Sequence, residues 1–175
     1  MTRKARAESA TGIYHVILRG INRQNIFENH EDYEKFAECL LYAKNKDGIK
    51  IYGYCLMSNH VHIVIGAGIE SISISFKRIG VRYVSWYNRK YIRQGPLFQD
   101  RFRSEPIEND NYLLWALRYV HQNPVKAGMC KNPEEYKWSS FADYTGSGAG
   151  LTDTEEVLAM FSKNPADQVA LFREF

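Results

Sequence analysis

Two strand-like segments separated by a very short connection constrain this chain more than any other feature. Residues 49–57 and 61–66 have the composition of β-strands, and a Ser-Asn pair joins them. So short a connection predicts an antiparallel hairpin. Because side chains alternate across a strand, His60 and His62 at the start of the second arm should share one face.

A second pair of polar side chains follows downstream. The pattern around residues 117–124 is typical of the last turns of a helix that ends at Pro124. Tyr119 and Asn123 are four residues apart and therefore share one helix face. If that face covers the histidine side of the hairpin, a phenol, an amide and two imidazoles converge, which suits phosphoryl transfer to a tyrosine. Taken singly, each pattern also fits an ordinary structural histidine or a packed tyrosine.

Five segments of the chain, in this order, resemble the REP-associated tyrosine transposases, which belong to the single-tyrosine, His-hydrophobic-His transposases. The likeness spans about residues 11 to 145. The segments that carry it are residues 14–24 (YHVILRGINRQ), 54–62 (YCLMSNHVH), 98–104 (FQDRFRS), 119–128 (YVHQNPVKAG) and 138–140 (WSS).

The resemblance implies an enzyme that cuts and rejoins DNA. It implies that His60, His62 and Asn123 hold a divalent metal ion, Mg²⁺ or Mn²⁺, and that Tyr119 is the nucleophile. The implied product is a 5′-phosphotyrosine link with a free 3′ hydroxyl. The implied partner is single-stranded DNA that carries hairpin (REP-like) elements, and monomer and homodimer both stay open.

The net charge of +3 hides an asymmetry along the chain. Residues 77–103 hold eight basic side chains against one acidic, whereas residues 131–175 hold four basic against eight acidic. Interleaved cations and aromatic rings suit single-stranded nucleic acid, since cations hold phosphates and rings stack on unpaired bases. The alternative is a solvated helix face with core aromatics. The predicted DNA contacts are Arg19, Asn22, Arg23, Lys77, Arg78, Arg82, Trp86, Arg89, Gln99, Arg101, Arg103, His121 (or a structural role for it) and Lys126.

The order of periodicities predicts an α+β fold. Strands are expected at 14–19, 49–57, 61–66 and 98–107, and helices at about 30–46, 71–91 and 110–123. This order resembles the split βαβ layout of ferredoxin-like and RRM-like antiparallel sheets. The first two helices should cover one sheet face, and the nucleophile-bearing helix should approach the other.

Length and composition divide the chain into residues 1–145, the catalytic domain, and 146–175. Glycines at 146–150 suggest a flexible linker, followed by a tail with two short helices. No apolar run approaches the roughly 20 residues that a membrane helix needs, so no membrane partner is expected. We expect a cytoplasmic protein, nucleoid-associated when bound to DNA.

Three other functions fit parts of the pattern. The first is a domesticated protein that binds hairpin DNA without strand transfer. The intact site residues argue against it, and they are His60, His62, Tyr119 and Asn123. The second is an RNA-binding module, which would require aromatic rings on the sheet face that the histidines occupy. The third is a metal-dependent hydrolase that uses water, which would leave Tyr119 without a role.

Overall fold

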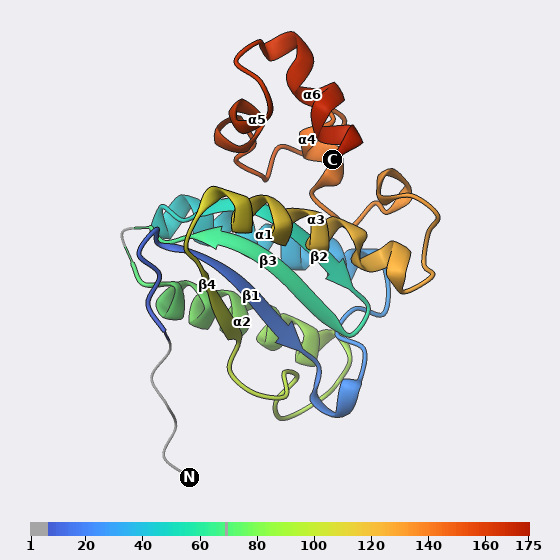
Figure 1. Cartoon of the computed structure of the whole chain (residues 1–175). Helices are drawn as coiled ribbons and strands as arrows, with labels where there is room; N and C mark the ends of the chain where they lie inside the picture. The colour runs from blue at the N-terminus through green and yellow to red at the C-terminus, as the bar shows by residue number, and fades with distance from the viewer. Residues whose placement is uncertain (1–6, 69) are drawn as a thin grey trace.

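A four-stranded antiparallel sheet with helices on both faces organises the chain, as the computed structural model shows for residues 7–68 and 70–175 (Figure 1). The strands are β1 (Ile13–Arg19), β2 (Lys50–Met57), β3 (His60–Gly66) and β4 (Arg103–Ile107). The α-helices are α1 (His30–Asp47), α2 (Ile72–Lys90), α3 (Asp110–Lys126), α4 (Phe141–Tyr144), α5 (Glu155–Phe161) and α6 (Pro165–Glu174), with short 3-10 helices η1 (Ile21–Arg23) and η2 (Pro133–Glu135).

The strand order β2-β3-β1-β4 places β1, which carries His15, and β3, which carries His60 and His62, in the centre of the sheet. β1 pairs with β3 so that Ile17 lies opposite His62 and Arg19 lies opposite His60. Val16, Leu18, Val61 and Ile63 point to the other face, where they are buried together with side chains of α1 and α2. Since α3 packs against β2 and β3 from the histidine side, the predicted α+β arrangement is confirmed.

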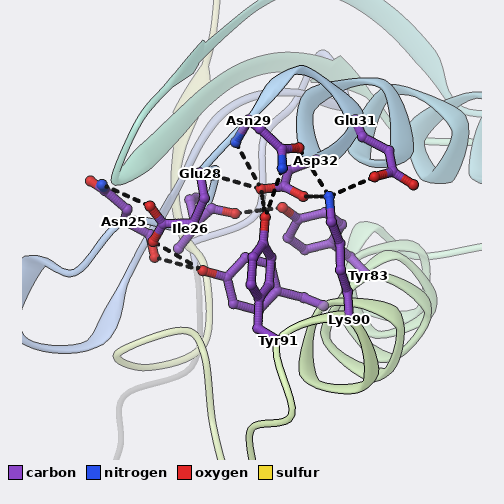
Figure 2. A network of polar contacts seen from close by, with 10 residues as sticks. Asn25, Ile26, Glu28, Asn29, Glu31, Asp32, Tyr83, Lys90 and Tyr91 are labelled. Carbon is purple, nitrogen blue, oxygen red and sulfur yellow. Dashed lines mark hydrogen bonds and ion pairs between the residues drawn. The ribbon is translucent and has the colours of Figure 1, made fainter.

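A buried carboxylate ties α1 to the end of α2 (Figure 2). Asp32 is fully buried and accepts hydrogen bonds from the backbone N–H groups of Glu28 (2.6 Å) and Asn29 (3.1 Å). It also accepts bonds from Lys90 Nζ (2.7 Å) and the Tyr91 hydroxyl (2.8 Å). Burial by itself raises the pKa of Asp32, but these donors outweigh it and hold the pKa below its ordinary value.

We expect Asp32→Ala to lower the free energy of unfolding by about 3 kcal/mol, because removing one partner of a buried pair leaves the others unsatisfied. This loss of stability lies at the lower end of the range for breaking a buried ion pair, because Lys90 keeps its ion pair with Glu31 (2.8 Å). A carboxyl whose pKa is depressed on folding stabilises the protein above its unfolded pKa, and this contribution is lost as the pH falls through the folded pKa. Urea unfolding should therefore show the wild-type advantage at neutral pH and a shrinking one below about pH 4. An advantage independent of pH would contradict the charge argument.

The Trp-Ser-Ser segment, residues 138–140, closes the outer edge of the sheet. Leu56 N donates to Trp138 O (2.8 Å), and Cys55 forms an isolated bridge with Ser139. Ser140 N donates to Tyr54 O (2.9 Å). This segment of the likeness therefore satisfies backbone groups that an edge strand would otherwise expose.

Two predicted boundaries are wrong. The fourth strand was expected to start at residue 98, but β4 begins at Arg103, because Phe102 leaves the ladder to pack against Phe76 of α2 (ring centroids 4.7 Å apart). The third helix was expected to end at Pro124, but α3 continues to Lys126. Proline removes only its own N–H donor, and the next turn closes through Ala127 N and Asn123 O (2.9 Å).

The tail after residue 145 packs onto the part of the chain that precedes it. Both predicted helices are present as α5 and α6, and Val157 and Phe172 are buried in the cluster that also holds Leu117 of α3. The glycine segment is held by hydrogen bonds from Gly150 N and Thr152 N to Asp143. The division at residue 145 stays a prediction, but the tail shares a core with α3.

Candidate active site

Two histidines of β3 form the centre of the candidate site. His60 and His62 lie on the sheet face that α3 partly covers, and their ring centroids are 5.1 Å apart. His62 is buried and His60 is half-buried. The prediction that both imidazoles share one face is therefore confirmed.

Each histidine is held through its Nδ1 atom. His62 Nδ1 lies 3.0 Å from Nε2 of His15, whose Nδ1 in turn lies 3.8 Å from Glu105. His60 Nδ1 donates to Asn59 Oδ1 (2.6 Å), and Asn59 Nδ2 donates to Arg23 O (3.3 Å). Within the described chain no hydrogen bond engages Nε2 of His60 or His62. In both rings one nitrogen is engaged and Nε2 is left for a ligand, as in many metal sites.

Both imidazoles are neutral at physiological pH. Burial lowers the pKa of His62 to about 3, and the charges of His15, His60 and Arg19 act in the same direction. Burial, followed by the nearby Arg19 guanidinium, also lowers the pKa of His60. A neutral imidazole is the form that binds a metal ion. The pair is therefore ready to act as a ligand without losing a proton.

A glycine lets α3 approach the sheet closely. A Cβ atom on Gly53 of β2 would come within 2.5 Å of Leu117 Cδ2 and 3.3 Å of Ser140 Oγ. Leu113, Leu117 and Val120 form the buried side of α3. The helix therefore turns Tyr119 away from the core of the tail and toward the histidine face.

Tyr119 lies edge-on to the buried histidines and is open to solvent. Its ring centroid is 5.5 Å from that of His62 and 5.8 Å from that of His15, and the residue is 43% exposed. Lys126 Nζ lies 5.2 Å from the centroid of the Tyr119 ring. The structure thus brings together a phenol, a cation and the imidazole pair on one accessible surface.

Asn123 lies one turn after Tyr119 and donates from Nδ2 to the Tyr119 carbonyl (2.9 Å). No hydrogen bond joins Asn123 to His60 or His62 in the described part of the chain. Nor does any group of three His, Cys, Asp or Glu side chains among residues 7–68 and 70–175 have the placement needed to hold a metal ion. Two neutral imidazoles fit a divalent ion, and a third protein ligand must come from another residue type, for which the Asn123 amide oxygen is suited.

The family comparison decides the identity of this arrangement. The model of the family described as "Transposase IS200 like" matches residues 9–123, which include β1, the histidine hairpin, Tyr119 and Asn123. The chain belongs to the IS200-like transposases. None of the curated proteins matches it in sequence.

One solved structure shows the same fold, and two others give weaker matches. A REP-associated tyrosine transposase bound to a REP hairpin superposes with a TM-score of 0.71 at 18% identity, covering 86% of this chain and 88% of the other. A putative transposase from Deinococcus radiodurans R1 gives a TM-score of 0.47 at 15% identity, covering 69% and 97% of the two chains. A bacterial tRNA(His) guanylyltransferase-like protein in complex with ATP gives 0.44 at 14% identity, covering 70% and 62%.

Some of the predicted DNA contacts gather beside the candidate site of this transposase. Arg19, Gln99, Arg101 and Arg103 line a hollow of about 190 Å³ at the ends of β1 and β4. Asn22 and Arg23 lie in η1, next to Asn59, and both have positive φ (51° and 60°). Lys126 lies beside Tyr119.

Other predicted contacts are not brought to the site. Five of them lie on α2, which covers the opposite face of the sheet. These residues are Lys77, Arg78, Arg82, Trp86 and Arg89. Arg78 forms an ion pair with the buried Asp47, and Arg82 lies 3.6 Å from Glu38. Trp86 is half-buried beside Tyr83. A DNA-binding role for α2 stays a prediction that would need a strand wrapping around the sheet edge.

His121 is the one contact that must be corrected. Its ring is buried, Nε2 lies 2.7 Å from Ser140 Oγ, and the Phe141, Tyr144 and Phe172 rings surround it. Burial lowers its pKa to about 3, so it is neutral. His121 is two residues from Tyr119 in the sequence and lies on the opposite side of α3. Of the two roles considered for it, the buried environment fits the structural one.

Two residues of the site were not among the candidates. His15 contacts His62 and Asn59 contacts His60, and both occur in the segments of the likeness. Alternation along β1 would have placed His15 on the same face as Arg19. What the sequence lacked was the register of β1 against β3.

No helix of the described chain is both long and apolar enough to span a membrane.

Proposed function

We propose that this transposase cuts and rejoins hairpin-forming single-stranded DNA through Tyr119, with a divalent ion, Mg²⁺ or Mn²⁺, held by His60, His62 and Asn123. The observation that carries the proposal is the exposed Tyr119 ring, packed edge-on against His62. A REP hairpin is the ligand of the transposase that shares this fold, which supports a substrate of the same kind.

The chain supplies most of the chemistry with its own side chains. The Tyr119 oxygen forms a bond to phosphorus as the bond from phosphorus to the 3′ oxygen breaks. The phenol proton passes to solvent, and the 3′ oxygen takes up a proton from solvent to become a hydroxyl. A phenol is mostly protonated and weakly nucleophilic at neutral pH, so the phosphate must be activated. The ion would act as a Lewis acid on phosphate oxygens. Lys126 adds a positive charge 5.2 Å from the centroid of the tyrosine ring.

His15 and Asn59 fix the orientation of the ligand pair. With Nδ1–H of His62 directed to His15 Nε2, the lone pair of His62 Nε2 faces the site. Asn59 does the same for His60 and ties it to the η1 loop through Arg23 O. Outer partners of this kind typically change metal affinity by roughly 10–100-fold.

The direct test is incubation of the full chain with hairpin-bearing single-stranded oligonucleotides and Mn²⁺, followed by a denaturing gel. We expect a protein–DNA species that survives denaturation and disappears when a chelator is present. Binding without any covalent species, over hairpins selected by the protein itself, would instead favour the hairpin-binding protein that lacks strand transfer.

DNA binding should weaken steeply with salt. Each phosphate contact with a single strand contributes a slope of about −0.7 in log affinity against log salt, so roughly five contacts imply about a 100-fold loss between ~50 and ~200 mM salt. Arg103→Ala, in the hollow beside the site, should reduce that slope by about 0.7. Arg173→Ala, in the tail and paired with Glu134 (3.4 Å), should leave it unchanged. Titrations at several salt concentrations measure both, and an equal effect of the two variants would argue against the hollow as the DNA path.

A further inference from the structure

A groove next to Tyr119 has no role in the chemistry above. It encloses about 290 Å³ between α3 and the β1–β4 side of the sheet, and its lining includes Ile17, Glu105, Tyr112, Trp115 and Tyr119. The volume lies near the lower end of small-molecule sites, roughly 300–1,000 Å³. It suits one nucleotide rather than a duplex.

The wall of this groove is an exposed aromatic stripe on α3. Tyr112, Trp115 and Tyr119 recur at helical spacing and are 40%, 67% and 43% exposed. The buried side of the same helix already supplies its core contacts through Leu113, Leu117 and Val120. Trp115 is therefore not needed to hold α3 in place, and an indole this exposed beside an active site is more typical of a binding surface.

A cationic hollow continues the groove. Its lining shares Ile17 with the groove and adds Arg19, Arg101 and Arg103. All three arginines are exposed, and within residues 7–68 and 70–175 neither Arg19 nor Arg103 forms an ion pair with a carboxylate. An apolar, aromatic slot that leads into a hollow with three guanidinium groups and one carboxylate, that of Asp100, matches a base attached to a phosphate chain.

We propose that this groove binds one unpaired nucleobase next to the phosphate that Tyr119 attacks, with Trp115 as the stacking platform. The proposal rests on the proposed function, because it assumes a single strand at Tyr119. The base lies between Trp115 and Ile17, and the backbone runs toward Arg19 and Arg103. Glu105 lies on the base side, where its charge repels phosphate and keeps the strand in one orientation.

The test uses equilibrium binding, so it does not depend on cleavage. The probe is a fluorescein-labelled hairpin oligonucleotide with unpaired flanks, selected from a randomised pool by the wild-type protein. Abasic sites are scanned through the flanks. We expect one flanking position where loss of the base weakens wild-type binding by about 5- to 100-fold, the range for one base–aromatic stack.

Trp115→Ala should weaken binding by a similar factor and should abolish the effect of the abasic site at that one position. Trp115→Phe should restore most of the affinity because a ring remains. Leu41→Ala, an exposed apolar side chain of α1 on the other sheet face, is the matched control and should bind as the wild type does. Thermal unfolding should be nearly unchanged for all three variants, since the altered side chains are exposed.

The outcomes separate this proposal from the proposed function. If the pool yields no hairpin bound by the wild-type protein, hairpin recognition itself is wrong and the groove proposal falls with it. If the wild type selects a hairpin but Trp115→Ala binds it equally well, or the abasic effect persists in that variant, the groove holds no base while the proposed function stands.

Discussion

Tyr119→Phe is expected to eliminate the covalent protein–DNA species while leaving the fold and hairpin binding intact. The change removes one oxygen, the atom that forms the bond to phosphorus, and the other exposed tyrosine of α3, Tyr112, lies two turns away. Cleavage should fall by more than about 1,000-fold, since loss of a covalent nucleophile costs up to roughly 10⁶-fold in other enzymes. A denaturing gel after incubation with Mn²⁺ and a hairpin oligonucleotide measures the adduct.

The same helix offers a matched control. Tyr112→Phe removes the same atom two turns earlier from another exposed tyrosine of α3, and it should form the adduct at a near-normal rate. Tyr119 donates no hydrogen bond from its hydroxyl to the described residues, so unfolding of the Tyr119→Phe variant should match that of the wild type. An adduct of undiminished yield in Tyr119→Phe would remove Tyr119 from the mechanism and reopen the hydrolase that uses water.

The sequence was sufficient for the parts of the site that depend on local periodicity. A period of two residues fixed the common face of His60 and His62, and a spacing of four fixed the common face of Tyr119 and Asn123. The strand and helix order then placed α3 opposite α1 and α2, as the structure confirms. Each of these inferences depends only on residues close together in the chain and on a familiar topology.

What the sequence did not predict depends on long-range packing. The contact between His15 and His62 requires the register of β1 against β3, which no local pattern specifies. The burial of His121 requires the tail, whose Phe172 covers it from beyond residue 145. The basic, aromatic segment forms α2, which lies away from the site. Aromatic rings of α2 pack in the core on the sheet face opposite the histidines. The charge and composition of a segment do not indicate which face of the sheet that segment will cover.

His62→Ala is expected to raise the dissociation constant for Mn²⁺ by more than about 100-fold and to stop metal-dependent cleavage. The substitution removes a ligand, whereas loss of an outer partner alone costs roughly 10–100-fold. His30→Ala, an exposed histidine of α1, should bind the ion normally. Calorimetric titration with Mn²⁺ in the absence of DNA measures binding independently of activity, and thermal unfolding shows whether the buried site still folds.

His15→Phe separates a positioned ligand pair from a merely adjacent one. The phenyl ring keeps the stacked position near His62 but cannot accept its Nδ1–H, so the orientation of His62 is no longer fixed. If this contact directs His62 Nε2 toward the ion, Mn²⁺ affinity should fall between those of the wild type and His62→Ala. Unchanged affinity in His15→Phe, with loss in His62→Ala, would mean that the sheet alone orients the ligand. Equal affinity in all three proteins would show that the ion does not bind at His62, and the proposed metal site would then have to be abandoned.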